Sequence, residues 1–354
     1  MSKAAEASGD PRQAARAIDA LRRGWPVSVE GADAALYLVA IETAFDLSAV
    51  SGLLISASRA ATLKLVNQRA AADTALPVMI RAPADLDAAL ARAIADPTLD
   101  LQYPMKGPFL AAALPDDAAA ASAMELARLA GLLPAFAVVE GVDQRIDKVS
   151  PEDIAAFNDS AALEIAARAR LPVASHAQAE IVAFRSMADS TDHVALIIGK
   201  RDGSPPVVRL HSECLTGDVL GSLKCDCGPQ LHEALSQISH AQWGILLYLR
   251  QEGRGIGLIN KLRAYALQDQ GFDTVDANTR LGFAIDARDF SVAARMLALL
   301  GVDTVRLLTN NPQKVAGLEA EGVKVAERLS LKIAANPHNA HYLDTKRDRT
   351  GHAL

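Results

Sequence analysis

Residues 211–230 read HSECLTGDVLGSLKCDCGPQ, and they hold all three cysteines of the chain, Cys214, Cys225 and Cys227. Three thiolates from one loop leave a tetrahedral metal ion with one open position, as in catalytic rather than structural zinc sites. A redox pair or small buried hydrophobic side chains are the alternatives. A disulfide across the single residue Asp226 would be strained, and burial does not explain the polar neighbours. The stretch therefore favours a zinc site.

The overall composition is typical of a globular protein of 354 residues, half of them hydrophobic, and this length allows two domains. No apolar run approaches the ~20 residues of a membrane helix, so we expect no membrane partner. The N-terminus lacks an apolar signal core, and free thiols agree with a reducing compartment, so we expect a cytoplasmic protein. The net charge of −6 argues against nucleic-acid binding.

The chemistry-bearing residues are concentrated in the C-terminal half, because all eight histidines and all three cysteines lie from His176 onward. Before that, the pattern alternates between short strands and amphipathic helices. Ser150 is a good helix cap, followed by Pro151, and we expect that helix to run to about Arg168. The N-terminal elements are expected at residues 14–21, 86–94 and 118–130 (helices) and 26–29, 53–55 and 135–139 (strands).

The C-terminal half alternates more clearly. Strands are expected at residues 194–198, 207–210, 245–249 and 305–308, and helices at 230–238, 256–268 and 291–300. This pattern predicts an α/β fold with mixed α+β layers in two domains.

Four segments and the tail carry a specific resemblance. They read RLHSECLTGDVLGSLKCDCGPQL (209–231), RQEGRGIGLINKLRAYALQDQG (250–271), ANTRLGFAIDARDF (277–290), LLTNNPQKV (307–315) and NPHNAHYLDTK (336–346). In these segments the chain resembles GTP cyclohydrolase II, over about residues 171–354. The resemblance implies a GTP cyclohydrolase II-like fold, a homodimer and one Zn²⁺ per subunit.

The resemblance also implies a reaction. Water activated by the zinc attacks guanine C8, and the imidazole ring of GTP opens with release of formate and pyrophosphate. The product is 2,5-diamino-6-ribosylamino-4(3H)-pyrimidinone 5′-phosphate, in the first step of riboflavin biosynthesis. The resemblance assigns Tyr265 to the zinc steps, Asp286 as proton acceptor and Arg288 as nucleophile on the α-phosphate. A guanidinium is normally protonated, so charge stabilisation is a plainer role for Arg288, and a surface salt bridge is the alternative.

Triphosphate binding needs positive charge and backbone donors. Gly253, Arg254 and Gly255 precede a predicted helix, where backbone N–H groups can approach anionic oxygens, although such a pattern is also common in plain turns. Lys314 can act as a point charge on phosphate, with a solvated surface lysine as the alternative. Phosphate chemistry also implies Mg²⁺ bound to the triphosphate. The expected GTP contacts are Arg209, Leu210, His211, Ser212, Glu213, Gln230, Glu252, Gly253, Arg254, Thr274, Thr309 and Lys314.

The N-terminal half resembles 3,4-dihydroxy-2-butanone 4-phosphate synthase, mainly in residues 55–65 and 123–140. Ala119 stands where that family has a metal-binding His, and Ser58 stands where an Asp is expected. We therefore expect residues 1–170 to form a degenerate, inactive synthase-like domain and residues 171–354 to form the catalytic domain. A bifunctional riboflavin enzyme and a noncatalytic nucleotide-binding or regulatory protein are the alternative functions.

Overall fold

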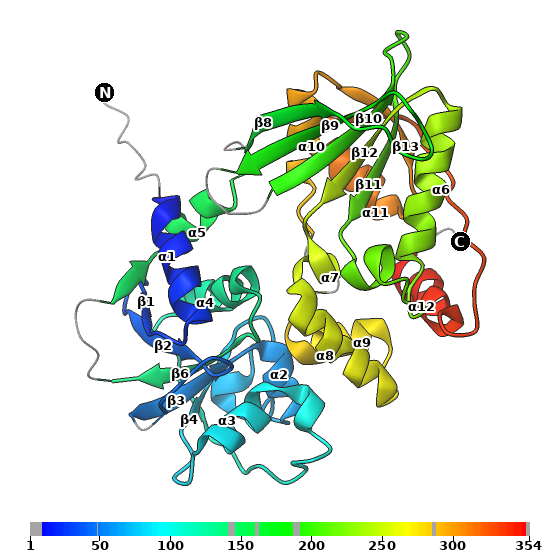
Figure 1. Cartoon of the computed structure of the whole chain (residues 1–354). Helices are drawn as coiled ribbons and strands as arrows, with labels where there is room; N and C mark the ends of the chain where they lie inside the picture. The colour runs from blue at the N-terminus through cyan, green and yellow to red at the C-terminus, as the bar shows by residue number, and fades with distance from the viewer. Residues whose placement is uncertain are drawn as a thin grey trace, which may run out of the picture. The chain divides into compact units, whose positions relative to one another are not determined.

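The computed structural model describes residues 9–47, 49–140, 146–159, 163–186, 192–284 and 288–351. They belong to two compact units, one drawn from residues 1–159 and 256–285 and the other from 160–255 and 286–354 (Figure 1). The chain therefore leaves the first unit, returns to it for two helices and leaves it again. A functional division at residue 170 stays a prediction.

The N-terminal unit is built on a mixed sheet, which in the described residues has the strand order β5-β4-β3-β6-β2-β1-β7. Its neighbouring strands are antiparallel except β1 and β7, which are parallel. The strands are β1 (Val27–Val29), β2 (Leu36–Ala40), β3 (Val50–Ile55), β4 (Val78–Arg81), β5 (Ala111–Ala112), β6 (Ala135–Val139) and β7 (Asp147–Val149).

Helices cover both faces of this sheet. One hydrophobic cluster joins a sheet face to α1, α4 and α5, and another joins the opposite face to α2, α3, α8 and α9. The helices are α1 (Pro11–Arg22), α2 (Ala57–Thr62), α3 (Ala88–Ala95), α4 (Asp117–Ala130), α5 (Pro151–Phe157), α8 (Gly257–Asp269) and α9 (Thr274–Leu281). Short 3₁₀ turns occupy Arg69–Ala71 and Pro97–Leu99.

The helix expected at residues 256–268 is present as α8, but its buried side chains lie in the N-terminal unit. Ala264 and Leu267 share a cluster with Ile55 and Ile94. On the same helix, the Arg263 guanidinium forms ion pairs with Glu42 at 3.0 Å and with Asp96 at 3.1 Å. Sequence order alone does not show this, because the apolar face of a helix does not specify which sheet it covers.

The C-terminal unit has a second mixed sheet, with strand order β14-β13-β11-β12-β10-β9-β8 within the described residues. Strands β14, β13, β11 and β12 are mutually parallel, whereas β12, β10, β9 and β8 pair antiparallel. The strands are β8 (Leu163–Arg170), β9 (Ala179–Ser186), β10 (Asp192–Gly199), β11 (Val207–Ser212), β12 (Trp243–Leu249), β13 (Thr304–Leu308) and β14 (Lys324–Leu329).

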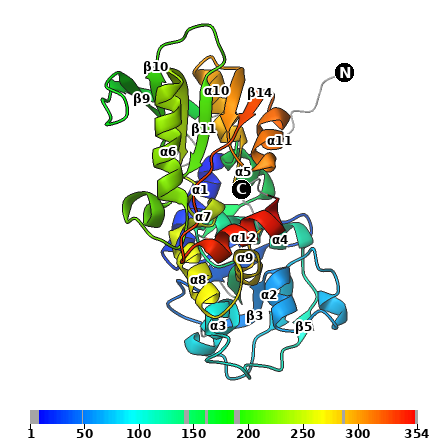
Figure 2. The ribbon, with the colours of Figure 1, turned by 90° about the vertical axis from the view of Figure 1, so that its right-hand side faces the viewer.

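Helix α6 covers one face of this sheet, and α10 with α11 covers the other, as Figures 1 and 2 show. Along β11, Val208 and Leu210 point into the α10 cluster, whereas Val207 belongs to the α6 cluster. This two-residue period follows from the pleat of a strand. The helices are α6 (Cys227–His240), α7 (Glu252–Gly255), α10 (Ser291–Leu299), α11 (Pro312–Ala320) and α12 (Ala340–Thr350).

The helix expected from Ser150 to about Arg168 is wrong in its second half. Helix α5 starts with the expected Ser150 cap but ends at Phe157, and Leu163–Arg170 forms the edge strand β8. The Ala, Glu and Arg residues of β8 favour a helix when only their local propensities are considered. Pairing with β9 and burial of Leu163 in the sheet core override that preference. Among the helices that the structure describes, none is both long and apolar enough to cross a membrane.

Replacing Arg263 by alanine should destabilise the N-terminal unit, because Glu42 and Asp96 would lose a shared partner that is only 18% exposed. We expect a loss of about 2 kcal/mol in the free energy of unfolding, measured by urea denaturation. Arg92→Ala on the exposed side of α3 is the matched control and should change stability by less than about 0.5 kcal/mol. Equal stability of the two variants would show that the ion pairs of Arg263 do not stabilise this unit.

Candidate active site

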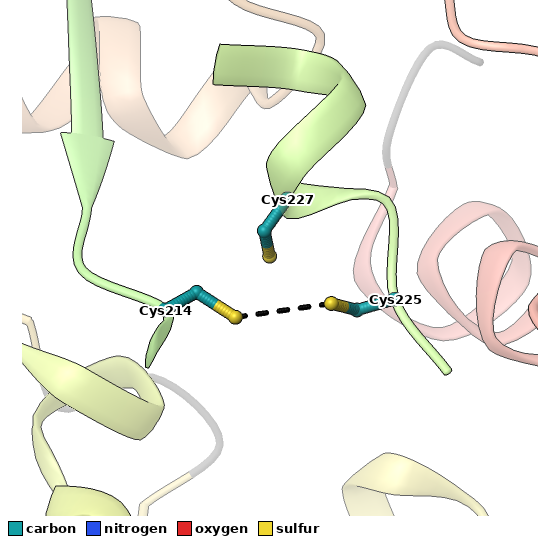
Figure 3. Close-up of side chains that lie close together, drawn as sticks. All are labelled: Cys214, Cys225 and Cys227. Atoms are coloured by element: carbon teal, nitrogen blue, oxygen red, sulfur yellow. Dashed lines mark hydrogen bonds between the residues drawn. The ribbon is translucent and has the colours of Figure 1, made fainter. Parts of the chain in front are cut away.

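Three thiol groups converge where β11 leaves the sheet and α6 begins (Figure 3). The Sγ atoms of Cys214, Cys225 and Cys227 all lie within 4.8 Å of one another, and those of Cys214 and Cys225 are 3.8 Å apart. Tetrahedral zinc with Zn–S bonds of about 2.3 Å places its sulfur ligands about 3.8 Å apart. The spacing therefore fits three ligands of one tetrahedral ion.

Glycine allows the loop to close over the sulfurs. Residues Leu215–Val219 form a single π-helical turn, and the N–H of Gly217 donates to the Sγ of Cys214 at 3.3 Å. A Cβ atom at Gly217 would lie 2.8 Å from the Sγ of Cys225 and 3.0 Å from the Sγ of Cys214. Real Cβ atoms do not approach this closely, so this position requires glycine.

The electrostatics of the cluster favour a bound cation. Hydrogen bonds from Cys214 and Cys225, together with burial, raise the pKa of Cys227 well above its ordinary value. The hydrogen bond with Cys214 is also the largest cause that raises the pKa of Cys225. Thiolates this close oppose one another's ionisation, whereas a divalent cation between them would stabilise all three. The donor set and its burial thus fit zinc.

Asp218 anchors the loop from Cys214 to Cys227, called the cysteine loop below, to the sheet. The side chain of Asp218 is only 3% exposed. Its carboxylate accepts hydrogen bonds from His211 Nε2 at 3.0 Å, Tyr248 Oη at 2.9 Å and the Cys214 N–H at 3.0 Å. Burial lowers the pKa of His211, which favours the neutral ring, and the adjacent carboxylate of Asp218 favours a proton on Nε2. Burial and the charge of Asp218 raise the pKa of Tyr248.

The register of two strands brings His211 and Tyr248 together. They are paired residues of the parallel strands β11 and β12, and their rings stack with centroids 5.6 Å apart. The Nδ1 of His211 has no hydrogen-bond partner among the residues described. Sequence reasoning missed Asp218 and Tyr248. The acidic residue inside the cysteine stretch was a signal for the first, but nothing local pointed to the second.

Most of the expected GTP contacts lie at one edge of the C-terminal sheet. Strands β11, β12 and β13 are parallel, so their carboxyl ends meet, and ligands of open α/β sheets bind at such edges. The expected contacts near this edge are Arg209, Leu210, His211 and Ser212 on β11, Glu213 after it, Gln230 on α6, Glu252, Gly253 and Arg254 after β12, Thr309 after β13, and Lys314 on α11.

Glu252 holds the start of the cysteine loop. Its carboxylate accepts from the N–H of Leu215 at 2.7 Å and from that of Gly253 at 2.9 Å. Gly253 and Arg254 both have φ of 63°, in the left-handed region, and Arg254 is not a glycine. Consecutive residues of this conformation turn the backbone sharply after β12, and strain at a non-glycine residue is common at functional sites.

Three further expected contacts are held by internal hydrogen bonds or an ion pair. Lys314 is buried, and its Nζ donates to the carbonyl of Leu210 at 2.8 Å, so it is not a solvated surface lysine. Thr309 is 2% exposed and accepts from the N–H of Asn311 at 3.0 Å. Glu213 is paired with Arg250 at 2.7 Å.

Arg209 and Arg288 form a concentration of positive charge. Burial and, to a smaller extent, the nearby charge of Arg288 lower the pKa of Arg209 to about 10, whereas Asp226 and Cys227 oppose the shift. Arg209 donates to the Leu308 carbonyl at 3.2 Å and also to Gln230. Arg288 precedes α10, with its guanidinium carbon 5.7 Å from the centroid of the Phe290 ring.

The remaining expected residues are elsewhere. Asp286 lies outside the described residues. Tyr265 lies half-buried on α8 in the N-terminal unit, with Lys261 Nζ 5.8 Å from its ring centroid. Thr274 begins α9 in the same unit and accepts from Gln268 at 3.0 Å. Their side chains thus belong to a different unit from the three cysteines.

Comparisons with known proteins agree on one family. Residues 164–330 match the family model described as GTP cyclohydrolase II. The GTP cyclohydrolase-2 of Enterobacter sp. (strain 638) is 61% identical over 175 residues, which cover 49% of this chain and 89% of that protein. The GTP cyclohydrolase-2 of Azospirillum brasilense is 41% identical over 361 residues, covering 95% of this chain and 92% of that protein.

The solved structures that match include a two-domain 3,4-dihydroxy-2-butanone 4-phosphate synthase from A. baumannii. It covers 90% of this chain and 99% of that chain, with 16% sequence identity and a TM-score of 0.30. A likeness this low carries no argument about the fold.

Asp218→Ala should loosen the cysteine loop. Alanine removes the carboxylate that accepts from His211, Tyr248 and Cys214, so all three donors lose this partner. We expect a loss of about 2–4 kcal/mol in the free energy of unfolding and faster reaction of the thiols with a disulfide reagent. Glu321→Ala, at an exposed acid of the same unit, is the control. Unchanged thiol reactivity would show that Asp218 does not hold the loop.

Proposed function

The chain belongs to the GTP cyclohydrolase II family, and from this membership and the cysteine cluster we propose that it works as a zinc enzyme. The enzyme hydrolyses GTP, opens the imidazole ring of guanine and releases formate and pyrophosphate, in the riboflavin pathway. The observation that carries the zinc proposal is the convergence of three Sγ atoms within 4.8 Å. Zinc bound there would supply a Lewis acid that lowers the pKa of water.

In this proposal Cys214, Cys225 and Cys227 hold the ion, and the residues around them fix the three sulfurs. Gly217 donates its N–H to Cys214, which tunes and orients that ligand, and Asp218 fixes the Cys214 backbone. Burial of two of the cysteines to 4–5% exposure limits the access of bulk water. A buried site of low polarity strengthens the electrostatic interactions inside it.

We propose that the nucleotide occupies the edge formed by the carboxyl ends of β11, β12 and β13. The charges of Arg209, Arg254, Arg288 and Lys314 suit a triphosphate, and the strained turn of residues 253–255 presents backbone N–H groups. Glu252 and Gln230 carry groups that could recognise guanine edges. The division between base and phosphate contacts belongs to this proposal, as do the roles of Ser212, Thr274 and Thr309.

Arg288 is proposed to act at the α-phosphate. The family resemblance assigns it as the nucleophile, with Asp286 as proton acceptor, and Tyr265 to the ring-opening steps. A guanidinium acting as a fixed positive charge needs no deprotonation, so we favour stabilisation of charge as pyrophosphate leaves. The proximity of Arg288 to buried Arg209 supports a site built for anions.

Three further expectations remain part of the proposal. Mg²⁺ would accompany the triphosphate, because it usually bridges phosphate oxygens with few protein ligands. A homodimer and a cytoplasmic location follow from the family resemblance and the sequence. A working N-terminal synthase is not favoured, because Ala119 is buried in α4 where a metal-binding His is expected.

The N-terminal unit is proposed to keep its fold without synthase activity. Arg59, beside Ser58, is 2% exposed and is held by Asp100 at 2.7 Å and by the Ile94 carbonyl at 2.6 Å. These contacts give Arg59 a structural role. The A. brasilense relative spans both halves, and its name records GTP cyclohydrolase activity alone.

The direct test is to incubate zinc-loaded protein with GTP and Mg²⁺ and to follow formate, pyrophosphate and the pyrimidine product together. Equal amounts of formate and pyrophosphate are expected. Pyrophosphate without formate would mean that ring opening is impaired, and the absence of both products would contradict the proposed activity.

The Cys225→Ser variant is the control for the metal. It should lose zinc and formate release, and full zinc content with full activity in this variant would refute the cysteine site.

Arg288→Ala should lower kcat by roughly 10²–10³-fold or more, because a positive charge at the reacting phosphate would be lost. Zinc content should stay normal, since Arg288 is not one of the proposed zinc ligands. Arg328→Ala, an exposed arginine on β14, is the matched control and should keep the wild-type rate. A near-wild-type rate for Arg288→Ala would remove this residue from the mechanism.

A further inference from the structure

The C-terminal helix α12 reaches the cysteine loop through one buried ion pair. Lys346 Nζ lies 2.6 Å from an oxygen of Asp226, the residue between Cys225 and Cys227. The Asp226 side chain is 1% exposed and that of Lys346 is 10% exposed. We propose that Lys346 is a positioning residue, which holds Asp226 and thereby places the two flanking thiols for the metal. This inference rests on the proposed zinc site.

Both oxygens of Asp226 are engaged. While Oδ1 pairs with Lys346, Oδ2 accepts from Gln230 Nε2 at 2.5 Å, and Gln230 in turn accepts from Arg209. Helices α6 and α12 therefore meet at one carboxylate, and β11 is linked to it through Gln230. Because Asp226 lies directly between two ligand residues, a change in its backbone conformation would move both sulfurs, and the bonds of its side chain oppose such a change.

The tail makes further contacts around this pair. Asn336, before α12, donates to the carbonyl of Leu223 in the cysteine loop at 3.4 Å. The ring of Tyr342 lies 4.4 Å from Lys346 Nζ, measured to the ring centroid, and covers it on the helix. The ammonium is thus confined between a carboxylate and an aromatic face, which holds its position more firmly than a surface ion pair would.

The charges of the site explain why a cation is needed at this position. Three thiolates and Asp226 would carry four negative charges, and a zinc ion would cancel two of them. Lys346 and Arg209 supply two positive charges near these groups, and the buried carboxylate of Asp218 adds one further negative charge. Uncompensated charge away from water is costly, so loss of Lys346 would leave Asp226 unpaired beside the thiolates.

The experiment compares Lys346→Met with Arg347→Met. Both remove a positive charge from adjacent positions of α12, but Arg347 is exposed and pairs with Asp344 and Asp348. Zinc affinity is measured by competition with a chromogenic chelator, and the site geometry by the thiolate-to-cobalt absorption of the Co²⁺-substituted protein. Loss of a partner of this kind typically weakens metal binding 10–100-fold.

We expect Lys346→Met to bind zinc at least about 10-fold more weakly and to change the cobalt spectrum. Arg347→Met should match the wild type, and Lys346→Arg should restore part of the affinity. Wild-type affinity and spectrum in Lys346→Met would overturn the inference. If that variant does not fold, Asp226→Asn serves instead, because it removes the same ion pair with little change of shape. The same 10-fold loss is expected, and wild-type binding again overturns the inference.

Failure of the proposed metal centre gives a different result. In that case the wild-type protein itself would bind neither zinc nor cobalt through its thiols, and the inference would fall with the centre. If the wild type binds metal and Lys346→Met binds it equally, only the role of Lys346 is refuted.

Discussion

The crowding of three thiol groups is the constraint on which the rest of the C-terminal unit depends. Their sulfurs share a space in which all separations are within 4.8 Å, and each thiolate disfavours ionisation of the others. Because the thiolates oppose one another's ionisation at these distances, contacts from the surrounding residues must hold the cysteine loop in place. Gly217 allows the close approach, Asp218 anchors the first cysteine, and Asp226 anchors the other two.

The sheet supplies these anchor points through its two-residue period. On β11, Leu210 points into the core beside α10, while Arg209 and His211 point toward the face covered by α6. Buried polar groups are costly unless they are hydrogen-bonded. Here Arg209 donates to Gln230 and His211 Nε2 bonds to Asp218, so the strand that fills the core also carries the network beneath the cysteine loop.

The two halves of the sequence are not independent in structure. Helices α8 and α9 lie beyond the cysteine stretch in the sequence, yet they complete the core of the N-terminal unit. Tyr265 and Thr274 lie on these helices. The N-terminal half thus lacks residues that its resemblance to the synthase family leads us to expect. It nevertheless provides the sheet against which α8 and α9 pack, and these helices carry Tyr265 and Thr274, two of the expected site residues.

The sequence by itself determined the cysteine cluster, the family and about half of the described strands and helices, because motifs and hydrophobic periodicity are local properties. It mispredicted residues 163–168 as helix, since only pairing with β9 decides that segment. It also missed Asp218 with Tyr248, 30 residues apart, and Asp226 with Lys346, 120 residues apart. These pairs depend on strand register and on where the last helix docks. Tertiary structure alone decides such partners, because hydrogen bonds and ion pairs require proximity in space, which residue spacing along the chain does not specify.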